Sequence, residues 1–130
     1  MFSNIEEARE FFKNDRFATC NGMVIEELGE NYAVTSVEIN PDHLNAAGTV
    51  MGGVYFTLAD FAFAVITNHV HKISVAIDSN ITFLTAAREG KLTARAEVIK
   101  TGKRTSYCRV EVRDANGKLC ADFTGTVAKL

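Results

Sequence analysis

The fold is decided by residues 45–68, NAAGTVMGGVYFTLADFAFAVITN. This stretch opens with turn-forming residues and the pair Gly52-Gly53, and it continues as a helical run that is apolar on every side. The apolar residues are Val54, Phe56, Leu58, Ala59, Phe61, Ala62, Phe63, Ala64, Val65 and Ile66. A helix that is apolar all round is typical of a buried helix. We therefore expect a helix at the centre of the fold.

One formal charge, Asp60, lies within this helical run, and no Lys or Arg occurs between Leu44 and His71. An isolated buried carboxylate is disfavoured unless neighbours hydrogen-bond it, its pKa rises or its function requires it. The apolar pattern continues on both sides of Asp60, which argues against an N-cap role. Asp60 is therefore either a structural acid, bonded to a neighbouring group, or a catalytic one.

A membrane span is a further alternative for this segment. Its uncharged part is near the lower limit of the ~20 residues that a span needs, and a mid-helix Asp costs roughly 2.5 to 3.5 kcal/mol on insertion scales. The internal Gly pair and the strand-like sequence that follows also argue against a span. We expect a core helix and no membrane partner.

The composition of the 130-residue chain fits one domain, residues 1–130, with a real hydrophobic core. Its net charge is -2 and it has no basic run, so we expect no nucleic-acid partner. The N-terminus lacks a basic segment followed by an apolar one, which argues against a secretory signal. Cys20, Cys108 and Cys120 are widely spaced without a C-x-x-C pair, which suits reduced thiols in the cytoplasm.

Flanking segments predict a sheet around the central helix. Ser3 and Glu6 have capping-box spacing before a short amphipathic helix over residues 4–14. A hairpin is expected over 22–30 and 32–40, ended by Pro41. Four more strands are expected over 73–84, 91–101, 105–114 and 118–130, the last two joined at Asn116-Gly117.

Alternation of apolar and polar residues in these strands implies one dry and one wet face. The economical packing is an α+β fold in which an antiparallel sheet of about five or six strands wraps around the long central helix. Such a sheet leaves strand edges open, and an open edge favours pairing with a second copy of the chain. We therefore expect an oligomer.

The ordered motifs over residues 20–128 resemble the hotdog-fold acyl-CoA thioesterases, specifically the PaaI-like branch. The resemblance rests on Asn45, Gly48, Gly52-Gly53, Leu58-Ala59-Asp60, the strand IDSNITFL over 77–84, the GxLxAxAxV run over 90–98, and Gly102-Lys103. It implies a thioesterase that hydrolyses medium-chain or aromatic acyl-CoA to the free acid and coenzyme A. No metal or cofactor is implied.

The resemblance also implies roles for individual residues. Asp60 would be the general base or nucleophile, the amides of Gly52 and Gly53 would polarise the thioester carbonyl, and Asn45 would orient substrate or water. One position departs from the family pattern His-Gly-Gly, because Met51 stands where the His usually is. This change removes a polar side chain beside the thioester and leaves the Gly52 amide intact.

The physical chemistry of a helix start agrees with these roles, because its unpaired amides carry partial positive charge and glycine allows close approach. The alternative is that both glycines serve only close packing or a tight turn. Gly52 and Asp60 are eight residues apart, or about 12 Å along one helix. Because they cannot easily serve one carbonyl, we expect a composite site across antiparallel central helices of a homodimer, paired again in a homotetramer.

Other residues are weaker candidates for a role in the site. Lys100, Lys103 and Arg104 flank a turn and could bind coenzyme A phosphates or simply be solvated. Polar residues of one strand, Asp78, Ser79, Asn80 and Thr82, could line the substrate path, and Phe56, Phe61, Phe63 and Phe83 could shape an acyl pocket or belong to the core. His69 and His71 lack a nearby third ligand for a metal.

Two other functions are compatible with the sequence. The first is a non-catalytic acyl-CoA binding or sensing protein on the same fold, although the short N-terminal helix is too small for a DNA-binding segment. The second is a hydratase or dehydratase, which would be expected to use a His. None of His43, His69 and His71 lies within the helical run beside Asp60.

Overall fold

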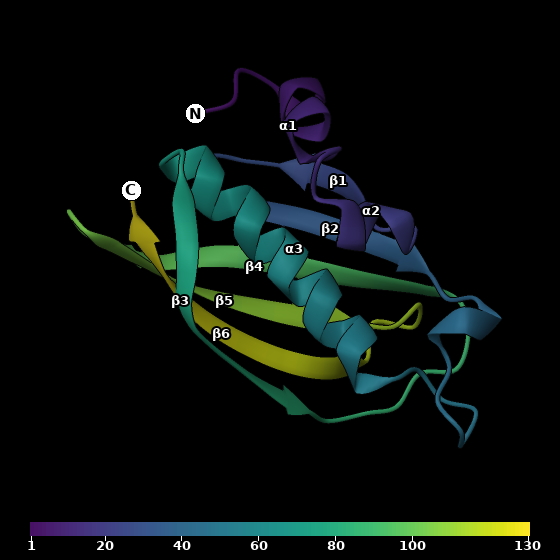
Figure 1. Ribbon diagram of the computed structural model, residues 1–130. Coiled ribbons are helices and arrows are strands. Elements are labelled where there is room, and N and C mark those ends of the chain that lie inside the picture. The colour runs from purple at the N-terminus through teal and green to yellow at the C-terminus, as the bar shows by residue number, and fades with distance from the viewer.

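The predicted central helix forms α3, Gly52–Val70, and lies across the inner face of the sheet in the computed structural model, which describes residues 1–130 (Figure 1). Leu58, Ala62 and Ile66 follow one another at helical spacing and are fully buried. The side of α3 that faces away from the sheet carries a partly exposed stripe of Gly53, Thr57, Asp60 and Ala64. Phe56 lies at the margin of this stripe, where its ring also packs against Phe123 of β6. The expectation that α3 is buried all round is therefore wrong for one chain, because the sheet covers only one side.

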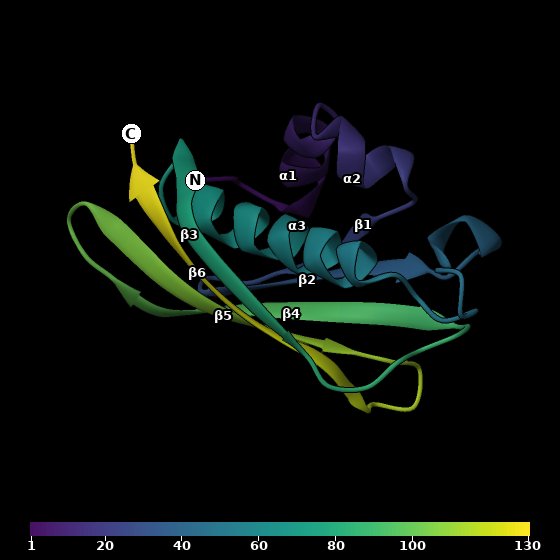
Figure 2. The ribbon, with the colours of Figure 1, turned by 60° about the horizontal axis from the view of Figure 1, so that its bottom comes forward.

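The sheet has six antiparallel strands in the order β1-β2-β4-β5-β6-β3, and Figure 2 shows it curving around α3. The strands are β1 Val24–Leu28, β2 Tyr32–Glu38, β3 Ser74–Phe83, β4 Lys91–Thr101, β5 Thr105–Arg113 and β6 Leu119–Lys129. Inward residues of β4 such as Leu92 and Ala94 are fully buried while Lys91 and Arg95 are exposed. The predicted α+β architecture and the dry and wet faces are confirmed.

Two short helices precede the sheet and lie over α3. The first, α1 (Ile5–Phe12), begins at Asn4, whose side chain accepts a hydrogen bond from the Glu7 amide at 2.9 Å. The predicted cap at Ser3 is wrong by one residue, because Asn4 is the better placed acceptor. The second, α2 (Arg16–Cys20), was not predicted, since five residues are too few to show a helical period. A single turn of 3₁₀ helix, η1 (Pro41–His43), ends the segment after β2.

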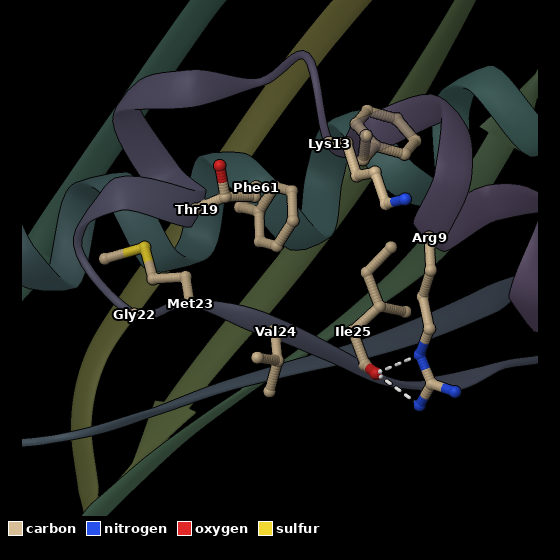
Figure 3. A pocket seen from close by; sticks show the side chains of 9 residues that line it. Arg9, Lys13, Thr19, Gly22, Met23, Val24, Ile25 and Phe61 are labelled. Atoms are coloured by element: carbon tan, nitrogen blue, oxygen red, sulfur yellow. Dashed lines mark hydrogen bonds between the residues drawn. The ribbon is translucent and has the colours of Figure 1, made fainter.

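The two edges of the sheet differ. At the β1 edge the Arg9 guanidinium of α1 donates two hydrogen bonds to the Ile25 carbonyl, at 3.1 and 2.7 Å (Figure 3). The β3 edge has no such cover, and the apolar side chains Val75, Ile77 and Phe83 along it are between 42% and 61% exposed. A long apolar edge of this kind is a template for pairing with another chain.

The helices and the cysteines bear on two further expectations from the sequence. No helix has the length and apolarity that crossing a membrane requires. All three cysteines are free thiols, Cys20 exposed and the other two buried. Burial raises the pKa of the Cys108 thiol to about 12, so this thiol is a small core residue.

Gly125 of β6 tests the packing of α3 on the sheet. A Cβ at this position would lie 2.7 Å from the Phe63 ring and 3.1 Å from the Phe123 ring, both fully buried. We expect Gly125→Ala to lower the free energy of unfolding by about 1 to 3 kcal/mol, because the rings must shift. Gly102→Ala is the control for chemical denaturation, since its nearest neighbour lies at 3.7 Å; equal loss in both variants would contradict this account.

Candidate active site

Asp60 lies on the stripe of α3 that the sheet does not cover. It is half-buried and opens into a hollow of about 130 Å³, whose other lining residues are Asp15, Phe17, Ala18, Phe56, Thr57 and Phe61. These residues come from α2, from the residue before it, and from the outer side of α3. The Asp60 carboxylate forms no hydrogen bond and no ion pair within the chain, so it is free to act on a ligand in the hollow.

Electrostatics around Asp60 favour the protonated form. Burial raises the pKa of the Asp60 carboxyl above its usual value, and the negative charge of Asp15 raises it further. This direction agrees with the expectation from the sequence. A carboxylate with a raised pKa is a stronger base and is better suited to take a proton near neutral pH.

The start of α3 presents free amides beside two further hollows, with Gly52 lining one and Gly53 the other. Met51 occupies the N-cap position and its side chain caps nothing, so the amides of Gly52 and Gly53 have no acceptor within the chain. A hollow of about 340 Å³ lies beside Gly52 and is lined by Val50, Tyr55, Phe83, Leu84, Thr85 and Ala86. These amides lie at the positive end of the helix and suit an oxyanion.

A single chain does not bring Asp60 and Gly52 together. Asp60 lies eight positions after Gly52 in α3, about 12 Å at 1.5 Å per residue, and each lines a different hollow. Gly53, by contrast, lies two turns before Asp60 and therefore on the same uncovered side of the helix. A partner that covers this stripe would contact both residues at once.

Asn45 is exposed and organises the turn that leads to α3. Its side-chain oxygen accepts hydrogen bonds from the amides of Ala47 and Thr49, at 3.0 and 3.1 Å, and its amide nitrogen donates to the Thr49 hydroxyl at 3.0 Å. One hydrogen of the Asn45 amide stays free for a ligand. Within one chain, Asn45 lies near the start of α3 and not beside Asp60.

The remaining polar candidates lie away from both hollows. Asn80 and Thr82 of β3 are opposite Thr124 and Asp122 of β6, which places their side chains on the outer face of the sheet. The exposed Lys100, Lys103 and Arg104 lie at the β4–β5 turn, at the end of the molecule opposite to Gly52 (Figure 1).

The histidines near the end of α3 have structural contacts. The His69 ring accepts a hydrogen bond from the Phe2 amide at 3.2 Å and stacks on the Phe2 ring. His71 lies at 3.0 Å from the Leu130 carbonyl. Both rings therefore help to fix the two ends of the chain against α3.

The four candidate phenylalanines divide into three groups. Phe56 and Phe61 line the hollow of Asp60, and Phe83 lies beside Gly52. Phe63 is only 1% exposed and packs against Phe123 in the core, so it shapes no pocket. Phe61 also lines a wider hollow of about 360 Å³ between α1, α2 and β1, which Figure 3 shows with Arg9 and Lys13 at one side.

Several site residues were not identified from the sequence: Asp15, Phe17, Tyr55 and Thr57. Asp15 and Phe17 depend on α2, which is too short for a periodic signal. Thr57 is one turn before Asp60, and this helical spacing could have identified it. Tyr55 resembles an ordinary apolar position, and only the fold reveals that its hydroxyl accepts a hydrogen bond from the Ala87 amide at 2.8 Å.

Comparisons with known proteins give a consistent result. A family model described as the thioesterase superfamily matches residues 47–121, which include Gly52, Gly53 and Asp60 but not Asn45. A relative from Archaeoglobus fulgidus is 37% identical over 128 residues, 97% of this chain and 83% of that protein. The acyl-coenzyme A thioesterase PaaI of Escherichia coli is 33% identical over 121 residues, 92% and 86% of the two chains.

Solved structures agree with these sequence matches. The structure of the Escherichia coli PaaI protein from the phenylacetic acid degradation operon has a TM-score of 0.90 at 32% identity, covering 95% of this chain and 90% of that one. A protein of Thermus thermophilus has a TM-score of 0.84 at 38% identity, covering 89% and 98%. The likeness therefore extends over sequence and fold together.

Substitution of Tyr55 tests whether the hydrogen bond between its hydroxyl and the Ala87 amide stabilises the hollow beside Gly52. We expect Tyr55→Phe to lower the free energy of unfolding by about 1 to 3 kcal/mol, because the Ala87 amide loses its acceptor. Exchange of the Ala87 amide hydrogen should become faster. Tyr107→Phe is the matched control, because Tyr107 is 41% exposed and its hydroxyl has no partner within the chain. An unchanged exchange rate at Ala87 would contradict this role.

Proposed function

The chain belongs to the thioesterase superfamily and is a PaaI-like acyl-CoA thioesterase of the hotdog fold, and from this premise we propose a composite catalytic site. Asp60 of one subunit acts as general base or nucleophile, and the Gly52 and Gly53 amides of another subunit bind the oxyanion. The products are the free acid and coenzyme A.

The observation that carries this proposal is that the Asp60 carboxylate is half-buried and has no partner within the chain. It is the only charged side chain between Gly52 and Asn68 of α3, it is half-buried, and no group in the chain pairs with it. A structural acid would be expected to use its oxygens on neighbouring donors. An unpaired carboxylate that faces a hollow is better explained by a ligand or water molecule that it contacts during the reaction.

The proposed reaction balances with water as the only added reactant. Asp60 takes a proton from water, whose oxygen adds to the thioester carbonyl carbon, and the oxyanion receives hydrogen bonds from the two glycine amides. The intermediate then expels the thiolate, which recovers the proton. If Asp60 attacks directly, an anhydride forms first and water hydrolyses it.

Helix geometry supports an intersubunit site. Gly53 and Asp60 both lie on the uncovered stripe of α3, and the midpoint between these two residues falls between Phe56 and Thr57. If a two-fold axis passes there, antiparallel helices set residue 60 of one copy opposite residue 53 of the other. The open β3 edge offers the same partner a strand to pair with. We expect a homodimer, which can pair again into a homotetramer.

The weaker candidates would contact substrate in the proposed dimer. An antiparallel partner brings its own Lys100, Lys103 and Arg104 toward this chain's helix start, where they would contact coenzyme A phosphates. Asn80 and Thr82 lie on β3 and would meet substrate at the boundary between copies. Asn45 would orient substrate with its free amide hydrogen. Phe56 and Phe61 suit a medium-chain or aromatic acyl group in the hollow of Asp60.

Thiol release from a panel of medium-chain and aromatic acyl-CoA esters tests the role of Asp60. We expect Asp60→Asn to keep the fold and to lower kcat by about 10²- to 10⁴-fold, because it removes the base. Glu89→Gln, an exposed loop acid, is the charge-matched control. Undiminished thiol release by a folded Asp60→Asn would exclude Asp60, and binding without release by the native protein would favour an acyl-CoA sensor.

Subunit mixing tests the composite site. Asp60→Asn and Gly52→Val should each be nearly inactive, but a mixed dimer keeps one site with native Asp60 and native Gly52. After dissociation and reassociation of equal amounts, about a quarter of native activity should return, because half of the dimers are mixed and each has one intact site. Absence of any recovery, with mixed dimers shown by mass spectrometry, would place both residues in the same subunit's site.

A further inference from the structure

A second carboxylate, Asp15, faces the hollow of Asp60. Asp15 holds the N-cap position of α2, and its backbone carbonyl accepts hydrogen bonds from the Thr19 amide and hydroxyl, both at 3.1 Å. An N-cap Asp ordinarily also uses its carboxylate on the first-turn amides, which stabilises a helix by ~1 kcal/mol. Asp15 forms no such hydrogen bond. Its carboxylate is instead left free to line the hollow.

No cation offsets the two acids. Asp15 and Asp60 are the only ionisable side chains that line this hollow, and the other contributors are Thr57 and four apolar side chains. Lys13, directly after α1, pairs with Glu10, and Arg9 of α1 binds the Ile25 carbonyl beside the neighbouring hollow (Figure 3). Arg16 of α2 is exposed and does not line the hollow.

Burial raises the pKa of Asp15 as well as that of Asp60. A negative charge that shares a small, partly apolar space with a carboxylate disfavours the ionised form of that carboxylate and makes it a stronger base. The shared hollow, the unused cap and the absence of a cation from the lining all favour a role for Asp15 in setting the proton affinity of Asp60.

We propose that Asp15 is a positioning residue of thioester hydrolysis, which keeps Asp60 a strong base and stabilises the proton that Asp60 takes from water. This inference rests on the proposed role of Asp60. When Asp60 accepts the proton, the negative charge of Asp15 across the hollow stabilises the new acid. The proton then passes to the departing thiolate, and both carboxylates return to their starting state.

The expected pH dependence follows from the sign of the charge. The negative charge of Asp15 raises the pKa of Asp60, so activity that needs ionised Asp60 is lost at a higher pH than it would be without Asp15. Removing the charge lowers the pKa of Asp60 and weakens it as a base. The acid limb of the kcat/KM profile should therefore move to lower pH, while the plateau falls.

The test compares Asp15→Asn with the native enzyme over the whole pH range. We expect the acid limb to move down by about half a pH unit or more and the plateau to fall several-fold. Asp15→Glu should restore the native limb, and Asp15→Ser is a second neutral variant that can cap α2. Glu10→Gln, on the exposed side of α1, is the charge control and should leave the limb in place.

Titration of the Asp60 carboxyl by ¹³C NMR, in native protein and in Asp15→Asn, separates the two proposals because it does not depend on turnover. A lower titration midpoint in the variant supports the inference. An unchanged midpoint and an unmoved acid limb would overturn the role of Asp15 and leave that of Asp60 intact. Native turnover in folded Asp60→Asn would overturn the proposed function and the role of Asp15 with it.

Discussion

The position of α3 on the sheet constrains every other feature of the site. Leu58, Ala62 and Ile66 are buried against the strands, and the hydrophobic free energy of this contact fixes the rotation of the helix about its axis. Once that rotation is fixed, Gly53, Thr57 and Asp60 must lie on the opposite side. Asp60 is thereby held at a surface that the chain itself covers only in part, so that it is desolvated but still accessible.

Partial cover of Asp60 matters for its proposed role as a base. A fully buried, unpaired carboxylate would cost too much free energy, and a fully exposed one would be a weak base. The segment of α2 contributes to this intermediate condition, because Phe17 and Ala18 line one side of the hollow of Asp60 and Asp15 adds a second negative charge. The hydrophobic core and the site therefore share one element, and α3 serves both through opposite faces.

The fold was largely predictable because its signals are local. The apolar run of α3, the alternation along β4 and the Asn116-Gly117 turn all act within a few residues, so the element order and the α+β class could be derived from the sequence. Strand order could not, since the placement of β3 beside β6 depends on contacts between residues far apart in the chain. The start of α1 was missed by one residue because Ser3 and Asn4 both suit an N-cap.

The sequence by itself determined that a carboxylate stands alone in an apolar helix, eight residues after the first of two glycines, and therefore that one chain does not easily bring the two onto one carbonyl. Only the tertiary structure decided which side of that helix stays uncovered, that Asp15 reaches the same hollow, and that Phe63 belongs to the core. The physical reason is range: helix geometry is set by neighbouring residues, whereas desolvation and charge coupling depend on whatever the folded chain brings within a few ångströms.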